Sequence, residues 1–108
     1  MINEIDETID EDGYPTEEFL DYIRSFDIVK GESLDLMQLV YDNWSYDLPY
    51  KDYYVDSGYI VFELATGGWS GNEALIGALA DNHLFWVINW FQSQRGGKYI
   101  FKVRKKND

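Results

Sequence analysis

The sequence predicts an α+β fold in a single domain spanning residues 1–108: an N-terminal helical hairpin, then a β-α-β-β unit with a small, mainly antiparallel three-stranded sheet. The chain has 108 residues, of which 45% are hydrophobic, enough for one core and too few for two domains. Apolar residues recur at helical spacing up to Trp44, and they alternate at strand spacing from Tyr59 onward. Between two strand-like runs, Gly96 and Gly97 have the composition of a β-hairpin turn.

The first half predicts two helices behind an acidic leading segment. Residues 1–15 are too polar to bury a face, and we expect them to be flexible. Thr16 is predicted to cap the first helix and Ser33 the second, so that the two form a helical hairpin. Residues 45–58 are rich in Tyr and Asp without a clear period, which predicts an ordered loop with room for a short extended piece.

The second half begins with a strand and a helix. Residues 59–66 alternate in the manner of a strand that has one mostly apolar face. Ser70 and Glu73 match a capping box, in which each side chain accepts a hydrogen bond from the other residue's amide. This pattern predicts a helix over residues 72–80.

Two further strands are predicted around the glycine turn. Residues 84–91 have two tryptophans at helical spacing, but they are dense in residues that favour strands. The Gly-Gly turn decides for a strand, paired with a last strand over residues 99–104. If that last strand lies between the other two, the whole sheet is antiparallel, and Glu63 could face Lys102 across neighbouring strands.

The net charge is −11, and most of the acidic residues lie in the first half of the chain. Residues 1–56 hold 16 of the 20 acidic residues and three basic ones, whereas residues 57–108 hold four acidic and six basic residues. The negative electrostatic field of this excess of acidic residues repels nucleic acid and anionic membranes. We therefore expect a protein partner with a basic surface, and no direct binding to nucleic acid or membrane.

Missing residue types exclude several kinds of site. The chain has no cysteine, which removes disulfides, thiolate metal ligands and a cysteine nucleophile, and no Cys/His cluster predicts a metal. The acidic stretch that starts at Thr8 departs from a calcium loop at its first and twelfth positions. His83 is the only histidine, and one serine with one histidine does not indicate nucleophilic catalysis. We assign no catalytic residue, metal or cofactor, and the lack of a leader or long apolar run predicts a cytoplasmic protein.

Carboxylates on the two helices, with the Tyr-rich connection, are the candidate partner-binding residues, because tyrosine joins apolar area to a polar tip at protein interfaces. They are Glu17, Glu18, Asp21, Asp35, Asp42, Asp47, Asp52, Asp56, Tyr46, Tyr50 and Tyr53. If these acids imitate a nucleic-acid backbone, the protein acts as an inhibitor or decoy of a basic partner, although solvated helix faces explain the same residues.

The string TGGWSGNE, followed by FW, NW, S, RGG, Y and F at fixed spacings, carries a family resemblance. On these residues, between Thr66 and Phe101, the chain resembles a set of small proteins encoded by phages and prophages. The resemblance implies an origin in a phage or other mobile element, where small acidic proteins are often inhibitors or decoys. It implies no activity or catalytic residue, and the acidic first half lies outside it.

The glycine-rich loop within this string supports a second hypothesis, a small-ligand or enzymatic domain. Backbone amides between a strand and a helix could cradle an anion, and a guanidinium from the hairpin tip could assist them. The candidate ligand-binding residues are Gly67, Gly68, Ser70, Gly71, Asn72 and Arg95. The loop lacks the lysine of a P-loop and the spacing of a dinucleotide fingerprint, so the loop's architecture is an alternative explanation for the same residues.

Overall fold

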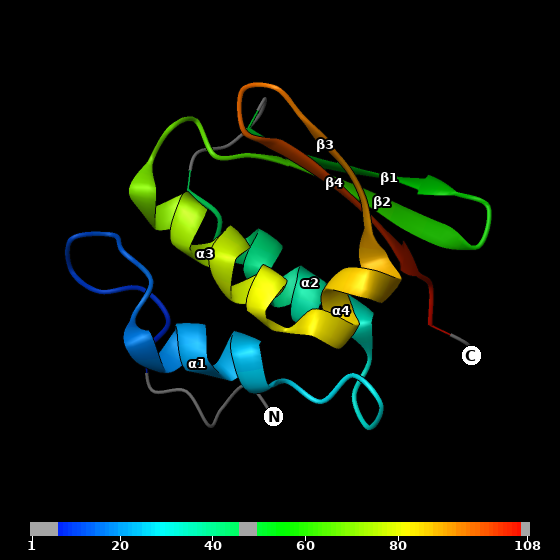
Figure 1. The fold of residues 1–108 in the computed structure, drawn as a ribbon, viewed down its shortest axis with the longest axis horizontal. Coiled ribbons are helices and arrows are strands. Elements are labelled where there is room, and N and C mark those ends of the chain that lie inside the picture. The colour runs from blue at the N-terminus through cyan, green and yellow to red at the C-terminus, as the bar shows by residue number, and fades with distance from the viewer. Residues whose placement is uncertain (1–6, 46–49, 107–108) are drawn as a thin grey trace.

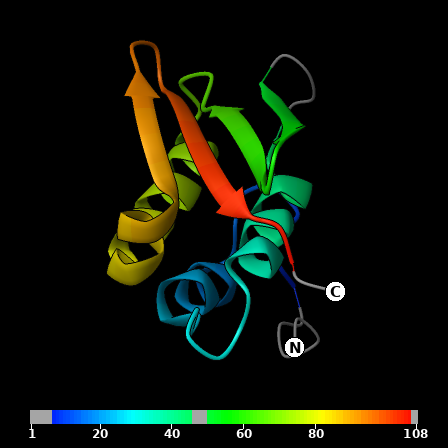
Figure 2. The same cartoon turned by 90° about the vertical axis from the view of Figure 1, so that its right-hand side faces the viewer.

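In the residues that the computed structural model describes, 7–45 and 50–106, four helices lie on one side of a four-stranded sheet (Figure 1). The α+β class is therefore confirmed. The elements in chain order are α1 (Glu17–Ser25), α2 (Ser33–Asp42), β1 (Lys51–Asp56), β2 (Tyr59–Ala65), α3 (Ser70–Asp81), α4 (His83–Asn89), β3 (Trp90–Gln94) and β4 (Lys98–Arg104). Figure 2 shows the described helices below the sheet, with the opposite sheet face uncovered by any of them.

The sheet has the strand order β1-β2-β4-β3, and every pair of neighbours is antiparallel. β4 lies between β2 and β3, which confirms the antiparallel arrangement predicted for that case. The prediction of three strands was wrong, because the short extended piece allowed for within residues 45–58 is a full strand, β1, that pairs with β2. β1 is an edge strand with five of its six residues exposed, so its sequence carries little apolar alternation.

Residues 84–91 divide between a helix and a strand, which corrects the prediction of one strand. Asn82 ends α3 and caps α4, since its side-chain oxygen accepts a hydrogen bond from the Phe85 amide at 3.3 Å. Phe85 and Asn89 are four residues apart and both buried, so a helix places both side chains on its inner face. The chain becomes extended at Trp90, and the predicted Gly-Gly hairpin forms between the shorter β3 and β4.

The first two helices do not form the predicted hairpin, because α1 packs mainly against α3 and α2 mainly against β4. Thr16 caps α1 as predicted, with its hydroxyl accepting a hydrogen bond from the Phe19 amide at 3.1 Å. Ser33 does not cap α2, because Glu32 holds the cap position. The Ser33 hydroxyl instead accepts a hydrogen bond from Asn89 Nδ2 at 3.0 Å, which joins the start of α2 to the end of α4.

Residues 8–15 form a docked turn where a flexible segment was expected. The Asp10 carboxylate accepts a hydrogen bond from the Tyr14 amide at 2.9 Å, which closes the turn on itself. Thr8 Oγ1 donates to Asn43 Oδ1 at 2.8 Å and so joins the turn to the end of α2. The first six residues of the chain lie outside the described part.

The core fills the space between the helices and the sheet. Aliphatic and phenylalanine side chains dominate it, and Trp44 closes one end by donating from Nε1 to the Ala65 carbonyl at 3.0 Å. The largest fully buried side chains are Phe19, Ile23, Leu36, Met37, Val40, Phe62, Leu64, Leu75, Leu79, Phe85, Phe101 and Val103.

Glu63 pairs with Lys98 rather than with Lys102. The strand register sets Glu63 directly opposite Ile100, and the carboxylate reaches diagonally to Lys98 Nζ at 3.0 Å. Lys102 Nζ lies over the Tyr59 ring, 5.2 Å from its centroid. The predicted Glu63–Lys102 pairing was therefore wrong. Ile100, the residue opposite Glu63, comes two residues before Lys102 on the same face of β4.

Candidate functional site

A groove of about 730 Å³ lies between the end of α1, the following loop and the exposed side of α2. Its apolar floor contains Tyr22 of α1, Phe26, which is the C-cap of α1, and Leu39 of α2, all half-buried. The rings of Tyr22 and Phe26 meet edge to face with centroids 5.8 Å apart. A Cβ at Gly31 would come within 2.9 Å of the Phe26 ring, so glycine at this position leaves room for the floor.

Three carboxylates stand on the rim of this groove. Asp35 and Asp42 are seven residues apart on α2, which places them on one helix face about 10 Å apart along the axis. Asp42 accepts a hydrogen bond from Gln38 Nε2 at 3.2 Å. Asp27 accepts hydrogen bonds from the amides of Val29 at 2.9 Å and Lys30 at 3.3 Å, which fixes its carboxylate at the loop. The groove is also lined by Lys30, so its rim is acidic on balance and partly preorganised.

One rim carboxylate already binds a lysine of the same chain. Lys106 Nζ lies 2.6 Å from Asp35 Oδ1, and both side chains are about half exposed. This contact brings the basic end of the chain onto the acidic half. It demonstrates that the rim is accessible to a lysine side chain that approaches from outside the groove.

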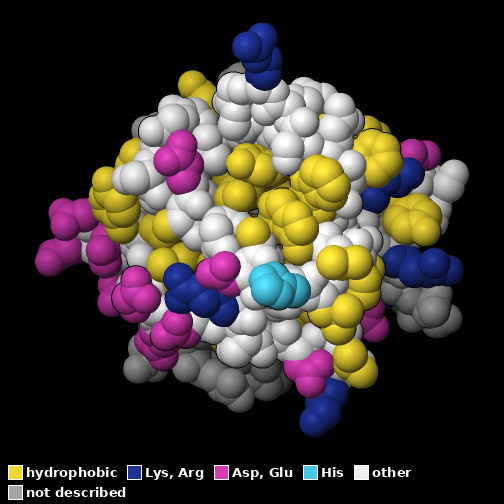
Figure 3. Space-filling view, viewed as in Figure 1, with side chains coloured by type: hydrophobic (Ala, Val, Ile, Leu, Met, Phe, Trp, Pro, Cys, Tyr) yellow, Lys and Arg dark blue, Asp and Glu magenta, His cyan; other side chains and the backbone are white. Residues whose placement is uncertain are grey.

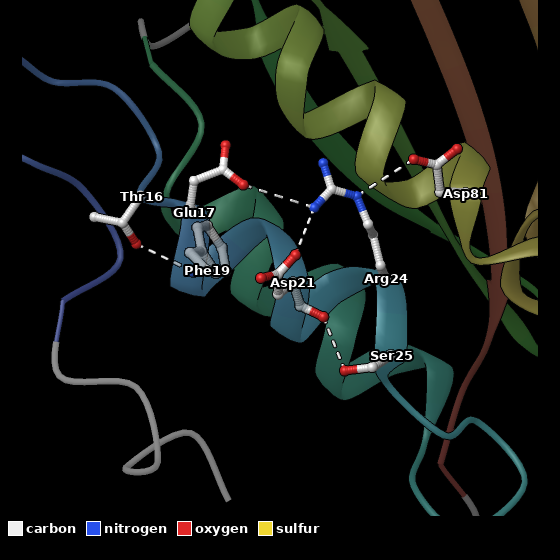
Figure 4. A network of polar contacts seen from close by, with 7 residues as sticks. All are labelled: Thr16, Glu17, Phe19, Asp21, Arg24, Ser25 and Asp81. Carbon is white, nitrogen blue, oxygen red and sulfur yellow. Dashed lines mark hydrogen bonds and ion pairs between the residues drawn. The ribbon is translucent and has the colours of Figure 1, made fainter.

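The carboxylates of α1 are partly neutralised by Arg24. The guanidinium lies 2.7 Å from Asp21, 3.3 Å from Asp81 and 4.0 Å from Glu17, so it joins α1 to the end of α3 (Figure 4). Of the predicted α1 carboxylates, Glu17 and Asp21 thus belong to a structural network, and Glu18 is exposed. Exposed pairs of this kind contribute little stability, about 0–1 kcal/mol each.

The remaining predicted partner-binding residues do not join the groove. Asp52 and Asp56 lie on the edge strand β1, at the opposite end of the molecule from α1 (Figure 1). Tyr53 packs its ring against Tyr41 at a centroid distance of 5.5 Å, and Tyr50 lies over Gly67. Outside the described residues lie Tyr46 and Asp47.

The loop between β2 and α3 needs glycines for its backbone conformation and for close packing. Gly67 and Gly68 have φ values of +64° and +74°, a region that favours glycine. At Gly71 the backbone is ordinary, but a Cβ there would collide with the Trp69 ring. The Trp69 ring also packs against Tyr14, with centroids 4.9 Å apart, so aromatic side chains cover part of the loop.

The capping box predicted from Ser70 and Glu73 does not form, because the Glu73 amide donates to the Trp69 carbonyl at 3.1 Å. Trp69 holds the cap position of α3, no side chain caps it, and the Ser70 hydroxyl donates to Tyr14 Oη at 3.2 Å. Asn72 is fully buried and accepts from the Ser45 amide at 3.1 Å while Nδ2 donates to the carbonyls of Ser45 and Thr66. The signature asparagine therefore joins two segments of backbone.

The β3–β4 turn lies beside this loop, as the anion hypothesis requires. The Thr66 amide donates to the Gly97 carbonyl at 3.0 Å, and a Cβ at Gly97 would meet the Thr66 hydroxyl. Arg95 is exposed in the turn. Since glycine conformation, ring packing and backbone hydrogen bonds account for the loop, an anion site at this place stays a prediction.

Catalytic and metal chemistry find little support in the described residues. Ser70 begins α3 and His83 follows its end, so about 18 Å of helix separates them. Over residues 7–45 and 50–106, no group of three His, Asp or Glu side chains is arranged to hold a metal ion. In the same ranges, no helix combines the length and apolar character that crossing a bilayer requires.

No family model, curated protein or solved structure matches the chain significantly. Among the features described above, the groove between α1 and α2 combines a concave shape with charged side chains. An acidic rim above an aromatic floor can hold the cationic groups of a peptide while burying its apolar side chains.

Sequence reasoning found two rim residues, Asp35 and Asp42, but missed the floor. Tyr22 and Phe26 were available as an i, i+4 pair on α1, and Leu39 as an apolar residue of α2. Phe26 and Leu39 belong to the apolar helical spacing that predicts the two helices, and such residues usually face the core. What the sequence does not contain is the relative placement of α1 and α2, which leaves these side chains half-buried.

Proposed function

We propose that the protein acts by binding another protein that has a basic surface, as an inhibitor or decoy of phage or mobile-element type. The groove between α1 and α2 is the binding site, and a basic segment of the partner occupies it. The observation that carries the proposal is the combination of an apolar floor with the three rim carboxylates of Asp27, Asp35 and Asp42.

The charge of the whole chain supports the same class of partner. A net charge of −11 steers cationic surfaces toward the protein and repels anionic ones. Lys106 on Asp35 supplies an internal example of the expected contact. Lysine or arginine residues of the partner would pair with the rim, and an apolar or aromatic residue between them would cover Phe26 and Leu39.

The shape of the site favours a bound peptide segment over imitation of duplex DNA. A duplex carries charges along a convex rod, one per about 1.7 Å of axis, so a mimic needs carboxylates spread along an extended face. Here the carboxylates of Asp27, Asp35 and Asp42 surround a groove, and two of the three on α1, Glu17 and Asp21, are paired with Arg24. A decoy function then depends on the partner's basic segment and not on the outline of a nucleic acid.

The first experiment uses defined peptides and the full chain. The probe is a fluorescently labelled amphipathic peptide in which pairs of Leu alternate with pairs of Lys or Arg. It is titrated with the wild type, with a groove variant, Asp35→Asn/Asp42→Asn, and with a β1 variant, Asp52→Asn/Asp56→Asn. Both double variants change the net charge by the same amount, but only the first alters the groove. We expect the groove variant to weaken binding about 5- to 30-fold and the β1 variant to change it less than about 2-fold.

A second experiment uses the same three proteins as baits for capture from host extract. A partner held in the groove is retained by the wild type and the β1 variant, is lost with the groove variant, and dissociates as salt is raised. If both double variants lose the partner equally, net charge and not the groove explains the binding. Equal retention by all three would contradict the proposal.

A further inference from the structure

An exposed apolar surface covers α4 and the start of β3. Its members are Leu84, Val87, Ile88, Trp90 and Phe91, whose exposed fractions run from 41% for Trp90 to 78% for Val87. Leu84, Val87 and Ile88 are spaced i, i+3, i+4 and so lie on one face of α4, opposite to the buried Phe85 and Asn89. Figure 3 shows hydrophobic side chains gathered beside the histidine that begins α4, whereas acidic side chains gather on the side of α1.

Charge distinguishes this surface from the rest of the chain. Residues 82–94 contain no Asp, Glu, Lys or Arg, in a protein whose net charge is −11. β3, which continues the surface, is an edge strand with all five residues exposed and none charged. Edge strands usually carry charges that prevent association, and β3 has none.

From these observations we infer that the α4 surface is the interface between two copies of this chain. Two copies of so acidic a protein repel one another through their acidic faces, whereas residues 82–94 contribute no like charges to a contact between them. A basic partner would gain no electrostatic attraction here, and an anionic membrane would be repelled by the remainder of the molecule. A second copy is the occupant that fits a surface whose own residues carry no charge and whose border at Phe91 holds a cation, Lys102 Nζ at 5.3 Å from the ring centroid.

The area of the surface is sufficient for a dimer. The five side chains, each about half exposed or more, offer on the order of 500 Å² of apolar area. A standard interface buries about 800 Å² per subunit, and a homodimer interface is about 65% apolar, which requires about 500 Å². The polar side chains of β3 and His83 can supply the rim.

The surface also has both a hollow and a projecting side chain. A hollow of about 330 Å³ lies beside α4, lined by Leu84 and Ile88 of α4 and by Val29 of the α1–α2 loop. Three charged residues, Lys30, Glu32 and Arg104, also line it. Val87 projects from the same surface with 78% of its area exposed. An isologous pair brings the same patch of both subunits together, so Val87 of each copy contacts the α4 surface of the other.

Sedimentation equilibrium of the full chain at about 1 to 100 µM tests the inference. We expect the wild type to approach twice the chain mass and Val87→Glu to shift toward the monomer, with a dissociation constant at least about 30-fold weaker. Val55→Glu is the matched control, because Val55 is also exposed but lies on β1, the other edge strand, and it should dimerise as the wild type does. Far-UV circular dichroism and urea midpoints confirm that both variants are folded.

A wild type that is monomeric throughout this range overturns the inference, and the patch then serves another partner. It is also overturned if Val87→Glu dimerises normally, or if Val55→Glu dissociates as much as Val87→Glu. The outcome is independent of the proposed function, since Val87→Glu should still bind the basic peptide and Asp35→Asn/Asp42→Asn should still dimerise.

Discussion

Replacing Asn72 by alanine tests whether the signature loop is held together by its own hydrogen bonds. The side chain is fully buried and makes three of them, to the amide and carbonyl of Ser45 and to the carbonyl of Thr66. Each contributes about 0.5–1.5 kcal/mol, and a buried group left without a partner costs about 1–3 kcal/mol. Three such bonds sum to about 1.5–4.5 kcal/mol, and because two of the three are longer than 3.2 Å we expect the lower half of that range, a loss of about 1.5–3 kcal/mol.

Equilibrium unfolding in urea, followed by tryptophan fluorescence, measures this loss. Gln38→Ala is the control, because the exposed Gln38 side chain donates only to Asp42 and its removal should cost less than about 0.5 kcal/mol. An Asn72→Ala protein that unfolds within about 0.5 kcal/mol of the wild type would refute the structural role. It would return Asn72 to the set of candidate ligand-binding residues.

Three further substitutions have outcomes that the structure determines. Gly77→Ala should stabilise α3 by about 0.5–1 kcal/mol in urea unfolding, because Gly77 is exposed in the helix interior and a Cβ there meets nothing within 4 Å. Ser70→Ala should lower the free energy of unfolding by less than about 0.5 kcal/mol, since Ser70 bonds only to the exposed hydroxyl of Tyr14; a loss above about 1 kcal/mol would restore the capping box. Lys106→Ala should tighten peptide binding about 1.5- to 5-fold by freeing Asp35, and unchanged or weaker binding in the titration would count against competition at the rim.

Patterns that bury one face of an element predicted that element correctly. β2 and β4 were found because Phe62 and Leu64, like Phe101 and Val103, alternate with outward-facing residues and enter the core. α1 was found from its apolar spacing and from Thr16, whose hydroxyl has a local partner in the Phe19 amide. In these cases a short stretch of sequence contains the whole reason for the structure.

The failures occurred where a distant segment decides the conformation. Ser33 and Ser70 have the composition of caps, but Asn89 and Tyr14, 56 residues away in each case, bond their hydroxyls instead. Residues 84–89 have strand-forming side chains, yet burial of Phe85 against the core overrides that preference. The same limit applies to the groove, whose rim is visible in the sequence and whose floor depends on packing.

The position of β4 has a consequence for how the chain folds. β4 comes last along the described chain but pairs with β2 at the centre of the sheet, so residues 66–97 must be gathered into a loop before the two strands meet. Pairing across so long a loop slows folding relative to the local β1–β2 hairpin. A chain emerging during synthesis therefore presents β2 with its inner edge open until β4 arrives. The interval before that closure is when this acidic protein is most exposed to mispairing, and its net charge of −11 opposes the encounter of two such intermediates.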